Sequence, residues 1–435
     1  MKAWILNPPF SKEMIKEGRC EQEVSLFQTN YPPFTMGYLA AIIRTKYDVE
    51  IIDSIAEKHS KKYICDKINL EKPKFVFVNT TTPTFDSDID LVKNFLNLSK
   101  KTKFYIYGVH ASYFSKSMKL GNRVNFIIGE PEKKAFELIG KQNVDFKDFP
   151  FPAWNLIDLM KYKIALKNKP FLIVQTSRGC PYSCSFCTAP FYYGKKYRKR
   201  DVKNVIEEIK YVKSLGVNDI LFYSEIFTFD QNYVMEICRE IIKQKIKISW
   251  MCNSRVDTVN LKLLKLMKKA GCWLISYGIE SSNQELLNIS KKNYNCELAK
   301  VAILMTKKAK ILSIGHFILG LSGETKKSIK STILYSKKIG LDFAFYYNAT
   351  PFPGSDLYEE KKDEIISNWQ NFEYGNNITN SKLDLNKFQS YAYRSFYINF
   401  FRIPTIYKLI NVLGVNQIPN IANAGVRSLL KLRKF

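Results

Sequence analysis

The chain has 435 residues, which gives room for two domains and a smaller additional segment. It holds 67 Lys and Arg against 40 Asp and Glu, a formal net charge of +27. No uninterrupted apolar stretch reaches membrane-spanning length, so no transmembrane helix is predicted. The basic charge leaves nucleic acid, an anionic membrane and an acidic substrate open as partners. The lysines are spread along the chain rather than clustered, which favours genome composition as their source.

The first 148 residues alternate short apolar runs with amphipathic stretches. Strands are predicted at Lys2–Leu6, Val49–Asp53, Phe75–Asn79, Phe104–Gly108 and Phe126–Gly129. Helices such as Met36–Arg44 and Asp88–Leu98 lie between them. This pattern predicts a doubly wound, Rossmann-like α/β domain, which binds ligands beyond the carboxyl ends of its strands. No glycine-rich nucleotide motif follows a strand here, so an ordinary nucleotide-binding domain is not predicted.

A second alternating region follows a proline-rich linker. Phe149–Trp154 is stiff because proline fixes its own φ and extends its neighbour, and residues 149–169 are assigned to the linker. Between residues 170 and 372, strands are predicted at Leu172–Thr176, Asp219–Phe222, Ile246–Met251, Trp273–Gly278, Leu312–Leu319 and Phe343–Asn348. Helices such as Val202–Leu215 and Leu261–Ala270 separate them. Six such units predict a partial (β/α)6 barrel with its chemistry at the carboxyl ends of the strands.

Three cysteines follow the first barrel strand with the spacing C-x3-C-x2-C: Cys180, Cys184 and Cys187. Thiolates this close together can hold three irons of a 4Fe–4S cluster, which leaves the fourth iron open to another ligand. A zinc site prefers four ligands in two close pairs, and no second C-x2-C or His pair follows. The other cysteines are interpreted as ordinary core or surface thiols, and the lack of regular pairing favours a reducing cytoplasm.

This cysteine motif, with Phe186 before its last cysteine, resembles that of the radical SAM enzymes. The resemblance implies a 4Fe–4S cluster whose open iron is chelated by the amino and carboxylate groups of S-adenosylmethionine (SAM). It also implies an electron donor such as flavodoxin or ferredoxin, since reduction cleaves SAM to a 5′-deoxyadenosyl radical.

Later segments resemble the SAM contacts of that family. Relatives usually carry two acidic residues after the second barrel strand, and here Ser224 replaces the first, so Glu225 alone is expected to bind the SAM ammonium. Arg255 is expected to bind the SAM carboxylate, since a guanidinium matches a carboxylate in a two-pronged geometry. Glu280 is expected to reach the ribose hydroxyls.

The segment Gly315–Thr325 resembles the glycine-bearing strand and turn that packs on the adenine. Within it, Ile318 and Gly320 are the expected contacts. Each of these matches has an ordinary alternative as a surface charge or a glycine turn. Their order and spacing together favour the radical SAM interpretation.

The amino-terminal domain resembles the cobalamin-binding domain that precedes many radical SAM domains. The matching phrases are Leu6–Pro9, Tyr31–Ala41, Thr80–Thr84, Tyr107–Ser112 and Ile128–Glu132, each near a predicted strand end. The resemblance implies cobalamin contacts from Thr80, Thr81, Thr82, Gly108, His110 and Glu130. There is no Asp-x-His-x-x-Gly motif, which implies cobalt without a histidine below it. We therefore interpret His110 as a strand-end hydrogen-bonding residue rather than a cobalt ligand, and an empty, vestigial domain stays open.

The remaining residues, 373–435, are predicted to form a helical extension rich in aromatic and basic side chains. Its most apolar part, Ile398–Val415, is broken by Arg402, Pro404 and Lys408. This stretch is expected either to lie on a membrane surface, through side chains such as Phe400 and Phe401, or to cover the barrel. The aromatic tail points to a small-molecule or lipid-like substrate, although aromatic residues also fill ordinary cores.

The sequence therefore predicts a cytoplasmic, cobalamin-dependent radical SAM enzyme that methylates an unactivated carbon. The resemblance implies that one SAM supplies the methyl group through cobalamin and a second supplies the radical. The alternatives are a radical cyclisation, rearrangement or coupling without methyl transfer, a tRNA-modifying enzyme, and a non-catalytic cobalamin sensor. Nucleic acid is not the expected partner because no short β-rich RNA-binding module follows the barrel, and the intact cysteine motif argues against a sensor.

Overall fold

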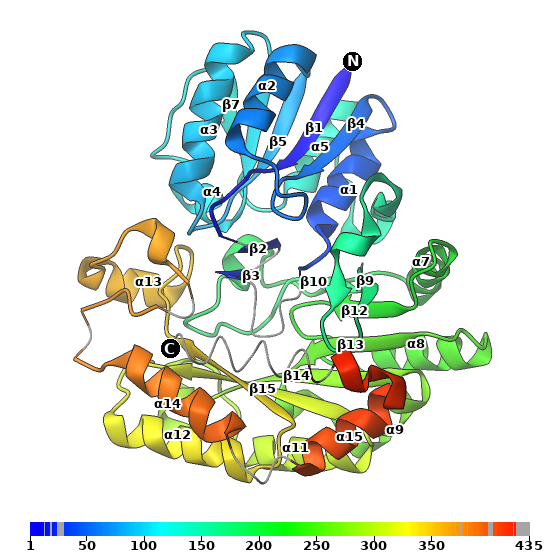
Figure 1. The fold of residues 1–435 in the computed structure, drawn as a ribbon, viewed down its shortest axis with the longest axis vertical. Coiled ribbons are helices and arrows are strands. Elements are labelled where there is room, and N and C mark those ends of the chain that lie inside the picture. Colours follow the sequence, from blue (N-terminus) through cyan, green and yellow to red (C-terminus); the bar gives the residue numbers. More distant parts are fainter. Residues whose placement is uncertain are drawn as a thin grey trace. The chain divides into compact units, whose positions relative to one another are not determined.

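The computed structural model describes residues 1–12, 14–17, 20–23, 30–373, 376–380, 382–398, 403–420 and 422. The chain forms two compact units (Figure 1). Unit 1 comprises Met1–Tyr162, Cys187–Lys195 and Pro351–Glu373, and unit 2 comprises Lys163–Phe186, Lys196–Thr350 and Tyr374–Phe435. Phe400, Phe401, Arg402 and residues 423–435 of the predicted extension lie outside the described residues.

Unit 1 contains a five-stranded parallel sheet with helices on both faces. Its strands are β1 (Lys2–Asn7), β4 (Asp48–Asp53), β5 (Phe75–Asn79), β6 (Lys103–Tyr107) and β7 (Val124–Phe126), in the spatial order β4-β1-β5-β6-β7. Its helices are α1 (Phe34–Ile43), α2 (Lys61–Glu71), α3 (Phe85–Leu98), α4 (Val109–Phe114), α5 (Pro131–Ile139), α6 (Ala189–Tyr192) and α13 (Asp356–Lys361). A hairpin of β2 (Met14–Glu17) and β3 (Cys20–Glu23) lies outside this sheet. The predicted doubly wound fold is confirmed.

The strand order fixes where this sheet can bind a ligand. The chain leaves β1 toward one edge, forms β4, and then returns to the other side of β1 with β5. The loops that follow β1 and β5 therefore diverge at the carboxyl ends of adjacent strands, which is where doubly wound sheets bind their ligands. Asn7 ends the first of these strands and Thr80 follows the second.

Alternating side chains build the core of unit 1. Trp4 of β1 and Val76 of β5 point to the face that Ile64 of α2 and Val92 of α3 cover, and all four are fully buried. Each such aliphatic or aromatic side chain contributes roughly 1.5–3 kcal/mol on burial. The sheet is thus fixed by apolar packing, and the polar groups collect at its carboxyl edge.

Unit 2 contains a curled sheet of six consecutive parallel strands. They are β9 (Lys169–Gln175), β12 (Asp219–Tyr223), β13 (Ser249–Ser254), β14 (Cys272–Glu280), β15 (Leu312–Leu319) and β16 (Phe343–Asn348), with the short β8 (Lys163–Ile164) antiparallel at the β9 edge. The helices are α7 (Val202–Ser214), α8 (Gln231–Lys243), α9 (Leu261–Lys269), α10 (Gln284–Ile289), α11 (Glu297–Lys308), α12 (Lys326–Lys338), α14 (Leu385–Tyr397) and α15 (Ile403–Leu413). Two-residue strands β10 (Ser177–Arg178) and β11 (Arg198–Lys199) pair beside the cysteine loop. This architecture confirms the predicted partial (β/α)6 barrel.

One barrel strand begins later than the sequence pattern predicts. Ile246–Ile248 was expected to open the third strand, but β13 starts at Ser249. The residues before it still belong to the end of α8, because Lys245 has a φ of +52° and the Ile246 N–H donates to the Ile241 carbonyl. This backbone pattern is the usual left-handed termination of a helix, which an alternating apolar pattern does not reveal.

Helix α14 covers the open edge of the barrel. The Tyr397 hydroxyl accepts the Ala344 N–H of β16 at 3.1 Å, and the Tyr393 hydroxyl accepts the Tyr346 N–H at 3.2 Å. Gln389 donates to the Tyr346 carbonyl at 2.8 Å. These side chains satisfy backbone groups that an edge strand would otherwise leave exposed. Several aromatic residues of the tail therefore cover the barrel.

Candidate functional site

The side chains singled out in the sequence lie where the barrel strands of unit 2 end. The cysteine loop follows β9, Ser224 and Glu225 follow β12, Arg255 follows β13, Glu280 is the last residue of β14, and Gly320 follows β15. Because these strands are parallel neighbours, their carboxyl ends share one rim of the sheet. The structure brings this set of sequence-predicted residues to one edge.

None of the three motif cysteines forms a disulfide in the structure. Cys180 is buried, while Cys184 and Cys187 are half-buried. Among the described residues, no three His, Cys, Asp or Glu side chains converge as the ligands of one metal ion do. A 4Fe–4S cube binds its cysteines at separate corners, so it does not need that convergence. The donor set, three thiols on one loop, fits a cluster with one open iron.

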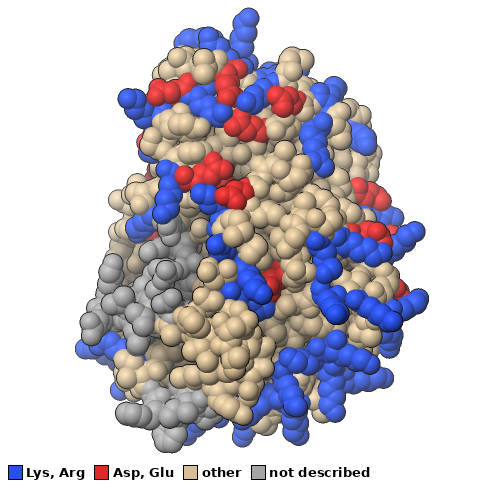
Figure 2. All heavy atoms as spheres, turned by 45° about the vertical axis from the view of Figure 1, so that its right-hand side comes forward, with Lys and Arg blue, Asp and Glu red and all other residues tan. Residues whose placement is uncertain are grey.

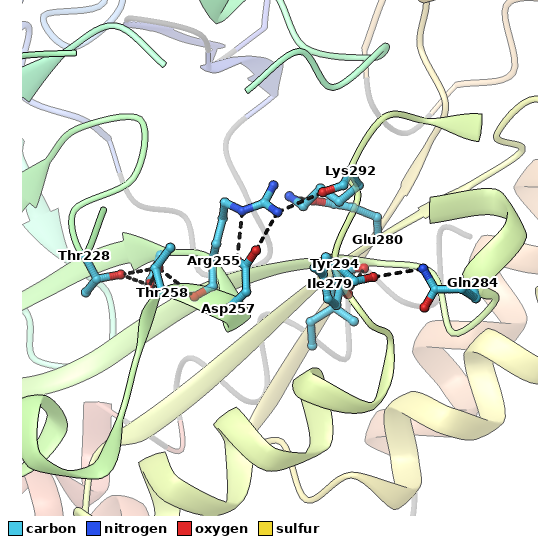
Figure 3. Close-up of polar contacts among 10 residues, drawn as sticks. Thr228, Arg255, Asp257, Thr258, Ile279, Glu280, Gln284, Lys292 and Tyr294 are labelled. Carbon is cyan, nitrogen blue, oxygen red and sulfur yellow. Dashed lines mark hydrogen bonds and ion pairs between the residues drawn. The ribbon is translucent and has the colours of Figure 1, made fainter. Parts of the chain in front are cut away.

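Glu280 is held in a strained conformation. Its φ is +66°, in the left-handed region, and the pairing of β14 with β15 shifts register between Gly278 and Glu280. Its carboxylate accepts a hydrogen bond from the Lys292 ammonium at 2.8 Å, and both side chains are almost fully buried (Figure 3). A Cβ on Gly278 would lie 2.5 Å from Glu280 Oε1 and 2.9 Å from Lys292 Nζ, so a larger residue there would displace the ends of this pair. Strain of this kind is typical of functional sites.

Lys292 is a residue that the sequence did not single out. Its ammonium lies 5.9 Å from the centre of the Phe186 ring in the cysteine loop. Burial disfavours its charge, but Glu280 and then the Cys184 thiolate hold the pKa of Lys292 above its usual value. The segment just before Lys292 also contacts the cysteine motif, because the Ser185 N–H donates to the Ser290 carbonyl at 2.9 Å. Lys292 therefore connects the cluster loop with the strand end that carries Glu280.

Arg255 has a guanidinium that is only partly engaged. Its Nε and Nη2 each donate to Asp257 at 2.9 Å, and Nη2 also donates to the Lys292 carbonyl at 2.8 Å (Figure 3). The group lies 3.8 Å from the centre of the Tyr182 ring, inside the cysteine loop. Its Nη1 is buried and has no hydrogen-bond partner among the described residues. A buried, unsatisfied guanidinium nitrogen beside the cysteines fits a carboxylate ligand.

The second strand end carries Ser224 and Glu225, both buried. The Ser224 hydroxyl has no hydrogen-bond partner in the described part of the chain. Glu225 supplies the carboxylate expected for the SAM ammonium, and its role stays a prediction.

The inner face of β15 and β16 carries a polar pair. His316 and Ile318 alternate on β15 as half-buried residues, and His316 Nδ1 lies 3.0 Å from the Tyr347 hydroxyl of β16. Burial, and then Lys292, lower the pKa of His316 to about 4. The imidazole is therefore neutral near pH 7. Sequence reasoning quoted this segment for adenine packing but missed the His316–Tyr347 pair, because strand pairing alone brings the two residues together.

Glu324 fixes the turn that follows β15. Its carboxylate accepts the N–H groups of Gly320 at 2.5 Å and Leu321 at 3.2 Å. Gly320 has a φ of +89°, so this turn requires a residue that tolerates the left-handed region. Burial raises the pKa of Glu324 to about 7.

The strand ends of unit 1 carry a different set of groups. The Thr80 hydroxyl donates to the Tyr107 carbonyl at 3.0 Å, and the Thr81 hydroxyl lies 3.0 Å from that of Thr84. Thr82 is fully buried. Gly108 has a φ of +134°, and a Cβ there would lie 2.0 Å from the Thr80 carbonyl oxygen. The loops after β5 and β6 are therefore packed directly against each other.

His110 is the most unusual group at this edge. It is fully buried, and its ring centre lies 4.3 Å from Phe85, 4.7 Å from Phe114 and 4.8 Å from Trp369. Neither ring nitrogen has a hydrogen-bond partner among the described residues. Burial lowers the pKa of His110 to about 3, so the ring is neutral. The expected role as a strand-end hydrogen-bonding residue finds no partner here.

The hairpin β2–β3 is tied to the same edge. Lys16 donates to the Asp88 carboxylate of α3 at 2.9 Å, with both side chains fully buried. Asn79, the last residue of β5, donates to the Lys16 carbonyl at 2.6 Å. Glu130, the remaining predicted contact, is buried directly before α5. At this edge Lys16 and Asp88 pair with each other, and Glu130 adds a buried carboxyl group to the hydroxyls and aromatic rings.

Comparison with known proteins identifies the barrel. Residues 174–335 match the family described as the radical SAM superfamily, from the end of β9 to α12. This part of the chain is a radical SAM domain. The matched range contains all three motif cysteines as well as Glu225, Arg255 and Glu280, so the cluster and SAM are the cofactors of this barrel.

Relatives of this radical SAM chain extend over both units. It is 28% identical to an uncharacterised methyltransferase of Pyrococcus horikoshii, over 87% of this chain and 89% of that protein. It is 27% identical to the anaerobic magnesium-protoporphyrin IX monomethyl ester cyclase of Rubrivivax gelatinosus, over 77% of this chain and 67% of that protein.

Solved structures share the fold. The radical SAM methyltransferase TsrM from Kitasatospora setae, with cobalamin and a 4Fe–4S cluster bound, superposes with a TM-score of 0.65 at 15% identity, over 83% of this chain and 78% of that one. The cobalamin-dependent radical enzyme OxsB, with aqua-cobalamin and SAM bound, gives 0.63 at 17% identity, over 78% of this chain and 52% of that one. At these identities the likeness concerns the fold.

Proposed function

We propose that this chain is a cobalamin-dependent radical SAM enzyme that methylates an unactivated carbon of a small, apolar substrate. The observation that carries the proposal is the pairing of the cysteine-bearing barrel with a doubly wound domain in one chain. The similarity to a methyltransferase covers 87% of this chain, so it includes both units. When bound, the cluster and SAM supply a 5′-deoxyadenosyl radical, and cobalamin supplies the methyl group.

The cysteine loop and the strand ends of the barrel are assigned to SAM and the cluster. Cys180, Cys184 and Cys187 hold the cluster. Arg255 offers its unsatisfied Nη1 to the SAM carboxylate, because the rest of its guanidinium is already fixed by Asp257. Glu225 binds the ammonium, and Glu280 binds the ribose hydroxyls from the orientation that Lys292 imposes.

The residues of unit 1 are assigned to cobalamin. The crevice between the loops after β1 and β5 is the ligand position of this strand order. Thr80, Thr81 and Thr82 follow β5 at this crevice, and Gly108 and Glu130 follow the next two strands of the sheet, β6 and β7. Together they offer hydroxyl, backbone and carboxyl groups to corrin amides. His110 stays a neutral residue of the aromatic cluster and does not bind cobalt, in line with its buried position among three rings.

The inner face of the barrel is assigned to the substrate. His316 and Ile318 of β15 and Tyr347 of β16 combine a neutral hydrogen-bonding pair with apolar surface. Such a surface orients a mostly apolar molecule through few polar contacts. Thiolates that hold a cluster need a reducing compartment, which is why the proposal places the enzyme in the cytoplasm with flavodoxin or ferredoxin as electron donor.

A second candidate reaction is radical ring closure without methyl transfer. The similarity to an anaerobic cyclase, which extends over 77% of this chain, favours it specifically. Both reactions begin with SAM cleavage, so the cluster and its cysteines do not distinguish them.

The distinguishing experiment follows the methyl group. Anaerobically reconstituted full-length enzyme is supplied with saturating SAM labelled in its methyl group and with candidate apolar substrates. Methylation predicts label on a substrate carbon, with S-adenosylhomocysteine and 5′-deoxyadenosine formed in equal amounts. Substrate turnover with 5′-deoxyadenosine alone and no transferred label would reject methylation and establish ring closure or rearrangement.

A further inference from the structure

The end of the chain has a one-sided charge. From Leu385 to Phe435 the sequence contains no Asp or Glu and eight Lys or Arg. The same stretch is rich in aromatic and aliphatic residues. Basic, apolar segments of this kind bind anionic membrane surfaces when their two kinds of side chain are exposed together. The structure of unit 2 shows where that exposure occurs.

Helix α15 has one face fixed on the barrel and one face in solvent. Leu409 is buried, and Lys408 donates to the Asp342 carboxylate at 2.6 Å and to the Ile311 carbonyl at 3.1 Å. On the other side, Ile406 is 50% exposed and Tyr407 is 68% exposed. The ion pair with the barrel sets the orientation of the helix, so its exposed apolar side chains are presented outward.

The turn after α15 continues this apolar surface. Val415 is 72% exposed and Ile418 is 46% exposed. Together with Ile406 and Tyr407 they form what we call the apolar tail surface. Single exposed apolar side chains are common on protein surfaces. Four of them within thirteen residues of one helix and its turn form a cluster, which is typical of a binding surface.

A lysine-lined groove adjoins the apolar tail surface. Leu413 and Gln417 of the tail line this cavity of about 950 Å³ at the amino ends of β12 and β13. The lysines that line it are Lys167, Lys169, Lys213, Lys245, Lys247 and Lys269. Asp219 is the acidic residue in the lining, and it already pairs with Lys167. The groove therefore has a strong excess of positive charge.

The lining of the groove is also partly apolar. It includes Ile241, Ile246 and Ile248. In Figure 2, lysine and arginine side chains gather along the lower part of the face shown, where acidic side chains are scarce. This end of the barrel carries the amino ends of the strands, whereas the cysteines follow a carboxyl end. The groove is consequently separate from the cofactor site.

We propose that the apolar tail surface and the lysine groove together form a peripheral binding surface for anionic phospholipid bilayers. Ile406, Tyr407, Val415 and Ile418 enter the boundary between headgroups and acyl chains, and the lysines contact headgroup phosphates. Either signal alone gives weak, reversible binding, and their combination makes it stable. The proposal does not depend on the reaction assigned to the barrel.

The exposed apolar side chains favour a bilayer over a nucleic acid. Phosphate-driven binding to RNA needs the lysines but gains little from isoleucine side chains that point into solvent. Among the described residues no helix is long and apolar enough to cross a membrane. The surface described here requires only contact with the bilayer.

The test is co-sedimentation of the full-length protein with vesicles of phosphatidylcholine, alone or mixed with phosphatidylglycerol. Binding is expected to the mixed vesicles and to weaken with added salt. Ile406→Ser with Tyr407→Ser should weaken it at least tenfold, while Leu298→Ser with Val301→Ser, at exposed positions of α11, should not. Lys169→Gln, Lys247→Gln and Lys269→Gln together should weaken it by about fivefold per lysine. The matched control is Lys326→Gln, Lys327→Gln and Lys330→Gln on α12.

Three results would overturn the proposal. The first is equal binding to both kinds of vesicle or to neither. The second is an equal loss in the α15 and α11 apolar variants, which would remove any special role of the apolar tail surface, or an equal loss in the groove and α12 lysine variants, which would reduce the interaction to net charge. The third is tight binding to tRNA that needs the groove lysines and ignores Ile406 and Tyr407, which would assign the groove to nucleic acid. Circular dichroism of each variant checks that exposed substitutions leave the fold intact.

Discussion

The strand ends of the two units differ in the kind of polar group that they bury. Unit 2 has the buried ion pair of Glu280 with Lys292, and it buries Arg255, whose ion-pair partner Asp257 is not itself buried. Unit 1 places hydroxyl groups and the neutral ring of His110 at its strand ends. Its buried Lys16 and Asp88 pair with each other, and the carboxyl groups of Asp53 and Glu130 are buried there as well.

This difference matches the chemistry of the proposed ligands. SAM carries an ammonium, a carboxylate and a sulfonium, and a site for it needs fixed charges of both signs. A corrin is a large ring with many neutral amide side chains, and hydroxyl and aromatic groups suit it. Buried ion pairs rarely contribute net stability, so under the proposed function the Glu280–Lys292 pair is kept for its ligand rather than for the fold.

The largest expected effect comes from the cysteines. Cys184→Ala should abolish 5′-deoxyadenosine formation, because the cluster loses one of its three protein ligands. The assay is anaerobic SAM cleavage by the reconstituted enzyme. Cys296→Ala is the matched control, since that thiol is also half-buried but lies outside the motif. Unimpaired cleavage by the Cys184 variant would remove the basis of the assignment.

The second effect tests the charges of unit 2. Lys292→Met should weaken SAM binding by roughly 10- to 100-fold, because a hydrogen bond to a charged group contributes about 1.5–3 kcal/mol. Equilibrium binding of SAM to the reconstituted enzyme measures it. Lys291→Met, at the exposed neighbouring position, should bind normally.

A folding defect of the Lys292 variant would have a separate signature. Glu280→Gln with Lys292→Met removes both buried charges and should restore stability without restoring SAM affinity. Identical SAM affinities for the Lys291 and Lys292 variants would contradict the role given to Lys292.

The third effect tests whether the His110 ring in unit 1 stays uncharged. The pKa of His110 is lowered to about 3 in the fold, so below pH 6.5 the unfolded chain takes up a proton that the folded chain refuses. Unit 1 should therefore lose about 1.4 kcal/mol per pH unit between pH 6.5 and 3 from this residue. Hydrogen exchange of α4 follows it, and His110→Phe should remove this component. An unchanged pH profile in the variant would mean that the ring is not buried as described.

The smallest effect has the opposite pH dependence and lies in unit 2. The pKa of Glu324 is raised to about 7, so the folded chain holds a proton between pH 4.5 and 7 that the unfolded chain releases. Its contribution to stability falls as the pH rises through this range. Glu324→Gln should stabilise the turn after β15 at pH 8 by about 1–2 kcal/mol and have little effect at pH 4.5. Urea unfolding at the two pH values measures it, and equal effects at both would refute the shift.

The parts of the fold that local patterns control were predictable. The limits of β5, β15 and β16 agree with the alternation of apolar residues in the sequence. The cysteine spacing lies within ten consecutive residues and located the loop after β9 directly. These features depend on neighbours in the chain, which is the information that a single sequence carries.

The parts that depend on pairing between distant elements were not predictable. Lys292 is one of many lysines, and its burial depends on the space above Gly278 on another element. His316 meets Tyr347 only through the register of β15 with β16. The hairpin β2–β3 and the buried pair of Lys16 and Asp88 join residues 72 positions apart. No pattern among residues close together in the sequence predicts these contacts.

The comparison between the two units is tested most directly by measuring how much iron and cobalt the protein binds. Full-length wild-type protein and the Cys184→Ala variant are reconstituted anaerobically with iron, sulfide and hydroxocobalamin, and bound iron and cobalt are measured in each. The account predicts about four irons per chain in the wild type, loss of the cluster in the variant, and equal cobalamin in both. A wild-type protein that binds no cobalamin, or a variant that loses cobalamin together with the cluster, would contradict the division of cofactors between the two units.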